Sequence, residues 1–495
     1  MNPVVKTRYG ASRGAVSDGV RVFKGIPYAA PPFGPNRLRP PQPVAPWRGV
    51  RDALAFGPTP PKQEIPPLVS ALMPEPAIPG EDCLTLNIWT PDAHAARLPV
   101  IVWIPGGMFE FGTAATAWYD GSHFARDGVI CVTINYRVGA EGFLYLGDGV
   151  ANRGLLDQAA ALRWVRDNIS AFGGDPGNVT IFGESAGAMS VATLLAMPRA
   201  EGLFQRAIAQ SGGAQHVMSA ATARRVGREL ARLLGVEATR AAIAAVPVAR
   251  VISAQAELKN ELVANPDPER WGVEAVTALL PWQPVVDGDT LPAPPLDRIG
   301  AGAGASIDLM VGTNTDEHRL FLAAGGALDS VSDEALAGLM ATYGLPVEAT
   351  LGAYRAAHPA ASPGDLLAAV QTDWYWRIPA IRLADAHARN SPATYMYEFA
   401  WRSPSFGGAL GACHSLEIPF VFDTLGHQTA GLLGPNPPQP LADRMHTAWV
   451  AFAMFGDPGW PRYSVPRRAT MRFDEYVEVV EDPWAMEREV WEGRR

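Results

Sequence analysis

The chain has 495 residues, of which 48% are hydrophobic, and it carries a formal net charge of −9 at pH 7. This length and apolar content are enough for a large core and exclude a disordered or fibrous protein. The acidic balance argues against nucleic acid or an anionic membrane surface as a partner, so we expect neither.

Cysteine usage and the first residues indicate the compartment. Cys83, Cys131 and Cys413 are too few for a disulfide framework and favour a reducing environment. The opening stretch MNPVVKTRYGASRG lacks the apolar segment of a signal peptide, and no apolar run approaches the roughly 18 residues needed to cross a bilayer. We expect a cytoplasmic, monomeric protein.

The first third of the chain passes from a proline-rich segment into strands. Residues 27–79 are rich in proline, as in the stretch PYAAPPFGPNRLRPPQPVAPW, which predicts an extended arm and loops, because proline suits neither a regular helix nor a central strand. Residues 83–90 alternate as a strand does. Residues 98–105 and 129–136 are nearly continuous apolar runs, which is typical of strands covered on both faces.

Helical and strand patterns then alternate. Residues 155–172 have helical periodicity, and the strand NVTIF at 178–182 leads directly into a glycine-flanked serine. A mainly helical insertion is expected at about 219–275, and strand character returns at 306–317 and 393–401. The alternation predicts an α/β fold with a mostly parallel sheet, and without linker-like composition we expect one domain over 1–495.

The stretch VTIFGESAGAMSVATLL places Ser185 between Gly183 and Gly187, with a strand before it and a helix after it. A strand, a sharp turn and a helix form a nucleophile elbow, in which the serine hydroxyl is exposed near the positive end of a helix dipole. The alternative is a glycine-rich turn with an incidental serine. Partners elsewhere in the chain decide between them, because serine needs a base and an orienting acid.

The expected chain order is serine, acid, histidine, which disfavours His94 and His123 as the base. Seven later histidines remain: His216, His318, His358, His387, His414, His427 and His446. His414 stands out because its loop joins a glycine-rich stretch to an apolar run. Candidate acids are Asp316 and Glu317, at the end of a predicted strand, and spacing alone does not choose between them.

The reaction also needs backbone donors for an oxyanion. The N–H of Ala186, directly after the serine, is one candidate, and the turn at Gly106 and Gly107 in IVWIPGGMFEFG could supply others. A plain tight turn is the alternative for the glycine pair. No ligand cluster supports a metal site, and no cofactor is expected.

Motifs along the chain resemble the type-B carboxylesterase family of α/β-hydrolases, and the compact bacterial members most closely. They occur in family order: FKGIPYAAPPFGPNRL, EDCLTLNIWTP, NYRVGAEGFL, NRGLLDQ, FGGDPGNVTIFGESAGAMS, QSGGA, PVVDGDTLP, GTNTDE, GACHSLEIPFVF and FGDPGWP. Together they span nearly the whole chain. The resemblance implies an α/β-hydrolase fold, with a central mostly parallel sheet flanked by helices.

The resemblance also implies roles for individual residues. Ser185 matches the family's nucleophile, His414 its base and Glu317 its acid, which selects Glu317 over Asp316. The remaining matched positions are the oxyanion donors Gly107, Met108 and Ala186 with Gly106 supporting the turn, and the polar positions Glu184 and Ser211 around the histidine.

Departures from the family pattern concern the pocket and the compartment. Pro105 replaces a frequent His or Tyr, and Met108 replaces Gly or Ala, which is expected to narrow the pocket while keeping its N–H. His318 follows the acid where Gly is common. Cys83 matches a cysteine that is disulfide-bonded in secreted relatives, yet no cysteine precedes it here, and the loop before it lacks the choline-binding tryptophan of cholinesterases.

The expected function is hydrolysis of small-molecule carboxylic esters of short to medium acyl chains, with aromatic esters or diesters also considered. A carbamate or amide hydrolase with the same triad is the alternative, and a non-catalytic binding protein of this fold is a third reading. We expect three residues near the acyl site, namely Met108, Phe109 and Phe111. Trp374, Trp376 and Phe406 either line the gorge or pack in the core.

Overall fold

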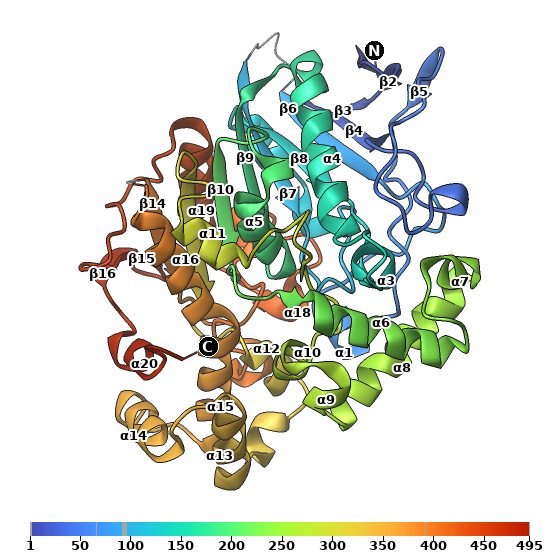
Figure 1. Ribbon diagram of the computed structural model, residues 1–495. Coiled ribbons are helices and arrows are strands. Elements are labelled where there is room, and N and C mark those ends of the chain that lie inside the picture. The colour runs from blue at the N-terminus through green and yellow to red at the C-terminus, as the bar shows by residue number, and fades with distance from the viewer. Residues whose placement is uncertain (1, 66, 92–96, 392, 495) are drawn as a thin grey trace.

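A computed structural model describes residues 2–65, 67–91, 97–391 and 393–494 of the chain. Its centre is an 11-stranded sheet (Figure 1). In spatial order the strands are β16 (Glu478–Glu481), β15 (Ala469–Phe473), β14 (Thr394–Phe399), β13 (Asp308–Asn314), β10 (Arg206–Gln210), β9 (Gly174–Glu184), β7 (Leu98–Ile104), β8 (Ile130–Ile134), β6 (Thr85–Pro91), β4 (Val20–Pro27) and β3 (Ala15–Ser17).

The strands from β15 to β8 in this order are parallel to their neighbours, whereas β16, β6, β4 and β3 pair antiparallel at the two edges. β7 and β8 are the nearly continuous apolar runs of the sequence, and residues 100–104 and 130–134 are fully buried. Such runs suit strands covered on both faces. The register pairs Gln210 with Glu184, so β9 and β10 end side by side.

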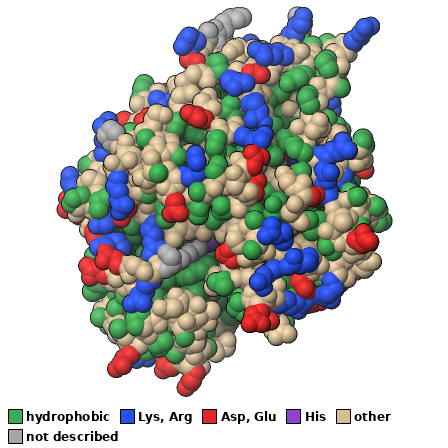
Figure 2. All heavy atoms as spheres, viewed as in Figure 1, with side chains coloured by type: hydrophobic (Ala, Val, Ile, Leu, Met, Phe, Trp, Pro, Cys, Tyr) green, Lys and Arg blue, Asp and Glu red, His purple; other side chains and the backbone are tan. Residues whose placement is uncertain are grey.

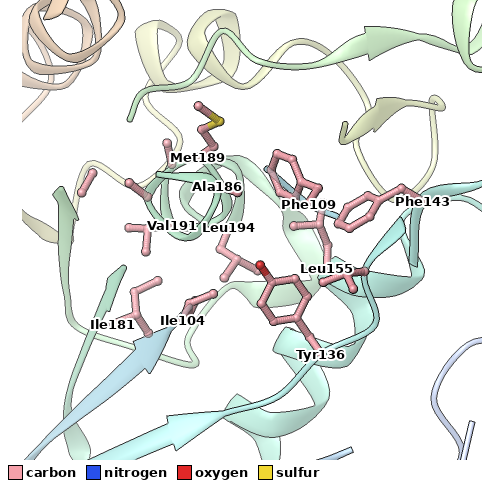
Figure 3. Packing of buried hydrophobic residues seen from close by; sticks show 14 of the residues in the cluster. Ile104, Phe109, Tyr136, Phe143, Leu155, Ile181, Ala186, Met189, Val191 and Leu194 are labelled. Atoms are coloured by element: carbon pink, nitrogen blue, oxygen red, sulfur yellow. The ribbon is translucent and has the colours of Figure 1, made fainter. Parts of the chain in front are cut away.

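Helices cover both faces of the sheet. One layer holds α4 (Arg153–Asn168), α5 (Ala186–Ala196) and α16 (Ile378–Ala388), which lie in front of the strands in Figure 1. The other includes α2 (Ser122–Arg126) and α19 (Gln439–Phe455). Each layer closes its own core, and Figure 3 shows part of the first, where side chains of α5 meet Ile104 of β7 and Ile181 of β9.

Two helical regions stand beside the sheet. The first follows the short strand β11 (Met218–Ser219) and contains α6 (Ala220–Leu234), α7 (Arg240–Ala245), α8 (Val248–Ala264), α9 (Pro268–Trp271) and α10 (Val273–Ala278). The second was not predicted and contains α12 (Arg319–Ala323), α13 (Asp333–Thr342), α14 (Val347–Ala357) and α15 (Pro363–Thr372), followed by the π-helix Asp373–Arg377. Its helices are short, which leaves little periodicity to detect.

The described residues between 27 and 79 form only the 3₁₀ turn Gly34–Asn36, the strand β5 (Val50–Asp52) and the helix α1 (Pro67–Leu72). β5 joins the small sheet of β1 (Val4–Lys6) and β2 (Ala11–Arg13). The remaining elements are α3 (Gly139–Phe143), β12 (Val285–Val286), α11 (Pro295–Gly300), α17 (Ile418–Phe422), α18 (Ala430–Leu433), α20 (Ala485–Val490) and further 3₁₀ turns at Ala117–Tyr119, Ile169–Phe172, Pro198–Ala200, Ala327–Ser330 and Ser405–Gly408.

Charge is spread over the surface in both signs. On the face that Figure 2 shows, Lys and Arg side chains are interspersed with Asp and Glu rather than gathered by sign. Across the described ranges, no helix combines the length and the apolar character needed to cross a membrane.

Candidate active site

Ser185 occupies the sharp turn between β9 and α5. Its backbone is at φ 58° and ψ −124°, a conformation rare for a residue with a side chain. The turn is tight: a Cβ on Gly183 would lie 2.6 Å from the carbonyl oxygen of Ile104, and a Cβ on Gly187 only 2.0 Å from the same atom. Backbone packing therefore requires both flanking glycines, and the strain of the turn presents the serine above the sheet.

Glu317 and His414 meet at the ends of the sheet. The Nδ1 of His414 lies 2.6 Å from Oε2 of Glu317, and the other carboxylate oxygen, Oε1, accepts a hydrogen bond of 2.7 Å from the backbone N–H of Asn314. Glu317 is fully buried, whereas 3% of His414 is exposed. The carboxylate thus fixes the imidazole with a proton on Nδ1 and leaves Nε2 for chemistry.

Asp316 turns away from this pair. Its Oδ2 accepts hydrogen bonds from Nη1 of Arg402 at 2.6 Å and from the backbone N–H of Ala412 at 3.0 Å. Spacing alone did not choose between Asp316 and Glu317 as the acid. In the structure Glu317 contacts the imidazole, while Asp316 holds the loop that carries His414.

The other later histidines have separate surroundings. His387 bonds Thr394, His446 bonds the carbonyl of Val421, and His318 stacks on the ring of Tyr375 with centroids 5.2 Å apart. Burial lowers the pKa of His318 to about 3, with a smaller contribution from His414, so its imidazole stays neutral. Of the remaining three, His216 stacks on the ring of Tyr375, and His358 lies beside the carboxylate of Glu487. His427 contacts the carbonyl oxygen of Ala117.

Three buried glutamates surround His414. Besides Glu317, Oε1 of Glu184 lies 3.0 Å from Nε2 of His414, and Glu417 accepts hydrogen bonds from the side-chain amides of Gln210 and Asn314. Burial raises the pKa of Glu184 to about 8 and also raises that of Glu417. Burial alone would lower the pKa of His414, but the charge of Glu184 and the hydrogen bond that Nδ1 donates to Glu317 raise it to about 9.

Ser185 lies beside this group without a hydrogen bond to it. Among the described residues, its Oγ has no side-chain partner, and Nε2 of His414 faces Glu184 instead. Ser415 donates a hydrogen bond of 2.7 Å to the same Oε1 of Glu184. Ser211, expected near the histidine, is buried with an Oγ that has no partner within the described ranges. Sequence reasoning thus missed the roles of Ser415 and Glu417, which follow His414 by one and three residues.

The glycine pair after β7 adjoins the serine. A Cβ on Gly106 would lie 3.1 Å from Cβ of Ser185 and 2.6 Å from the carbonyl oxygen of Glu184. Gly107 and Met108 both have positive φ, 111° and 55°. Within the part of the chain that the structure describes, their N–H groups donate to no protein acceptor, and the N–H of Ala186 opens the first turn of α5.

Ser185 and His414 line one cavity of about 390 Å³. Met108 and Phe111 line it as expected, but Phe109 is fully buried against Phe143. The other lining residues are Gly106, Gly107, Glu110, Gly112, Thr116, Trp118, Tyr119, Glu184 and Ser415, the arm residues Gln63, Glu64, Ile65, Val69, Met73, Pro74 and Glu75, the α8 residues Ala256, Lys259 and Asn260, and Leu320 and Phe321 of α12.

Of the three expected gorge aromatics, none lines this cavity. Trp374 and Trp376 are buried, and Phe406 is 46% exposed. Sequence reasoning missed the segment 63–75 and helix α8 as cavity walls, for which no motif gives a signal. Two ion pairs hold these walls: Lys62 with Glu75, and Lys259, whose Nζ lies 3.5 Å from Oε1 of Glu110. Among the described residues, no group of three His, Cys, Asp or Glu is placed to hold a metal ion.

A mostly parallel sheet with helices on both faces, a strained serine at the strand–helix turn and a histidine–glutamate pair beyond later strands define an α/β-hydrolase. The carboxylesterase family profile matches residues 1–491. The chain belongs to this family of carboxylic ester hydrolases.

Relatives share nearly the full length. The chain is 38% identical over 502 residues to a para-nitrobenzyl esterase of Bacillus subtilis (strain 168), covering 98% of each chain. It is 36% identical to a phenmedipham hydrolase of Pseudarthrobacter oxydans, covering 97% of each chain. It is 35% identical to a fumonisin B1 esterase of Sphingopyxis macrogoltabida, covering 92% of this chain and 84% of the relative.

Solved structures agree with the fold. A thermophilic para-nitrobenzyl esterase superposes with a TM-score of 0.87 at 36% identity, covering 99% of this chain and all of the other. A carboxylesterase of Geobacillus stearothermophilus superposes with a TM-score of 0.85 at 37% identity, covering 99% of each chain. The predicted α/β-hydrolase fold and the family assignment are confirmed.

Proposed function

We propose that the chain hydrolyses esters through an acyl-enzyme on Ser185, with His414 as the base and Glu317 as the acid. The observation that carries the proposal is the common cavity, which Ser185 on its strained turn lines together with a buried imidazole held at 2.6 Å by Glu317. No other histidine among the described residues lines this cavity.

In the first step, Nε2 of His414 takes the hydroxyl proton of Ser185 as Oγ attacks the ester carbonyl. Nε2 faces Glu184 in the free chain, so the imidazole turns toward Oγ as the substrate binds. Glu317 stabilises the imidazolium that forms. The imidazolium then protonates the leaving alcohol, and a water molecule activated by His414 hydrolyses the acyl-enzyme.

The tetrahedral oxyanion is bound by the backbone N–H groups of Gly107, Met108 and Ala186. The first two are free to donate hydrogen bonds to it, because they donate to no protein acceptor within the described residues, and the third is an open N–H of α5. One such donor contributes about 2.7–4 kcal/mol to transition-state stabilisation. Met108 supplies its N–H as well as a side chain that lines the cavity.

The cavity supports small, largely apolar esters as substrates. Its volume of about 390 Å³ lies toward the small end of the range for ligand pockets, and Met73, Phe111, Trp118 and Leu320 are among its apolar walls. We propose short to medium acyl chains and aromatic esters, in keeping with relatives named para-nitrobenzyl esterase and fumonisin B1 esterase. Carbamates are the second candidate, because a relative is named a phenmedipham hydrolase.

We also propose that the protein works in the cytoplasm as a monomer. Cys83, Cys131 and Cys413 are all buried and unpaired, which supports a reducing compartment.

The test of this function is turnover of p-nitrophenyl esters from acetate to palmitate, combined with labelling by an organophosphonate. We expect activity to peak at short to medium chains, because the cavity is small. We also expect one phosphonyl adduct per chain, on the peptide that contains Ser185. A folded protein that turns over no ester of the series and takes no label contradicts the proposal, and turnover of aryl carbamates alone selects the second candidate.

The pH dependence follows from the carboxylates around the base. The pKa of His414 is raised to about 9, and the base acts in its neutral form. We therefore expect kcat/KM to rise with pH, and the midpoint of this rising limb to lie above the ordinary histidine pKa of about 6.5. Glu184→Gln removes a negative charge that favours the imidazolium, so this limb should move to lower pH. Glu64→Gln, at an exposed position on the cavity rim, is the control and should leave it in place. A limb that is unmoved in Glu184→Gln contradicts the assignment.

A further inference from the structure

Trp376 packs directly against the imidazole of His414. The two ring centroids are 4.1 Å apart and the planes are inclined by 28°, which is a stacked arrangement. Trp376 is only 4% exposed, and it lies behind the histidine rather than in the cavity wall. Its neighbour Trp374, in the same π-helix Asp373–Arg377, stacks instead on Tyr343 at 4.8 Å.

We propose that Trp376 is a positioning residue for His414, whose indole face fixes the plane of the imidazole and stabilises the imidazolium formed during catalysis. The inference rests on the proposed role of His414 as the base. Glu317 contacts Nδ1 and Glu184 contacts Nε2, and neither contact fixes the tilt of the ring about the line that joins these two nitrogens. A flat, buried neighbour fixes this tilt, while the ring can still turn within its own plane from Glu184 toward Oγ of Ser185.

The π-helix holds Trp376 and the acid loop together. Nη1 of Arg377 pairs with Oδ1 of Asp373 at 2.5 Å across this turn, and Nη2 donates to the carbonyl of Thr315 at 2.6 Å. Thr315 stands two residues before Glu317. A single buried guanidinium therefore ties the segment carrying Trp376 to the segment carrying the acid, and π-turns of this kind are frequent at functional sites.

The indole also has an electrostatic effect. The negative face of an aromatic ring attracts a cation, and the attraction grows when both groups are desolvated. The titratable groups that face His414 are Glu184 at the end of β9, Glu317 after β13, Glu417 before α17 and His318 before α12. All of them remain when Trp376 is replaced, so a change in the pH limb of such a variant reports the indole.

The experiment compares Trp376→Leu and Trp376→Phe with the matched control Trp374→Leu. The control removes an equally buried indole of the same π-helix, which stacks on Tyr343. For each folded variant, kcat, KM and the pH profile of kcat/KM are measured on one p-nitrophenyl ester, and the fraction of active sites is counted with the organophosphonate.

For Trp376→Leu we expect kcat per active site to fall about ten-fold with KM changed less than about two-fold, and the rising limb to move down by about half to one pH unit. Trp376→Phe keeps a flat ring, so it should recover most of kcat and show a smaller shift in the same direction. Trp374→Leu should keep the wild-type profile.

Two results overturn the inference: a wild-type pH limb in both Trp376 variants, or equal effects in Trp376→Leu and Trp374→Leu. If the leucine variant does not fold, the phenylalanine variant decides, because an unmoved limb there also overturns it. Failure of the proposed function is recognised separately, since the wild-type protein would then take no phosphonate on Ser185.

Discussion

Ser185→Ala is expected to lower kcat/KM for a p-nitrophenyl ester by about 10⁶-fold while the protein stays folded. The substitution removes only Oγ, the atom that we assign to attack the carbonyl, and leaves the strained turn, the cavity and the oxyanion donors in place. A residual rate above that of water should remain, because the donors and the binding surface still act.

The matched control is Ser190→Ala, at a fully buried serine on helix α5, which follows Ser185. Its Oγ accepts a hydrogen bond of 3.0 Å from the side-chain amide of Gln158, so losing it should cost about 1 kcal/mol of stability and leave kcat near the wild-type value. Thermal unfolding of both variants separates stability from chemistry. Near-full activity in Ser185→Ala would mean that another group is the nucleophile.

The fold was predictable where local pattern and buried strands coincide. The apolar runs at 98–105 and 129–136 became β7 and β8, and the strand at 178–182 became the inner part of β9. Hydrophobic periodicity and composition can be read from a short stretch of sequence. A central parallel strand is apolar along its length whichever helices cover it, so this local pattern is enough to predict it. The later helices α13–α15 escaped detection because each is short, at 10 or 11 residues, which leaves little periodicity to detect.

The candidate site divides in a similar way. The turn at Ser185 and the loop of His414 carry motifs because their geometry depends on glycines and on particular polar groups. The cavity walls do not: residues 63–75 and Lys259 come from segments far apart in the sequence, and many apolar side chains would serve equally well. Sequence therefore indicates the chemistry better than the specificity. Trp376 shows the same limit, because only the fold reveals that it stacks on the imidazole.

Glu317→Gln is expected to reduce kcat by about 10⁴-fold with a smaller effect on KM. The glutamine side chain has nearly the same shape, but it cannot balance the charge of the imidazolium, and its amide N–H₂ group favours the tautomer with the proton on Nε2. The 2.6 Å contact with Nδ1 is the contact changed, and it lies fully buried, where water cannot replace the lost charge.

The matched control is Asp316→Asn, at the adjacent carboxylate. It weakens the ion pair with Arg402, whose side chain is 57% exposed, and exposed pairs of this kind contribute only about 0.2–1 kcal/mol. We expect its kcat to stay within about ten-fold of the wild-type value, because the loop of His414 keeps its bond from the N–H of Ala412 to the asparagine oxygen. If Asp316→Asn lost more activity than Glu317→Gln in equally folded proteins, Glu317 would not be the acid. The measured contrast therefore tests whether the 2.6 Å contact, and not mere proximity of a carboxylate to the loop, prepares the base.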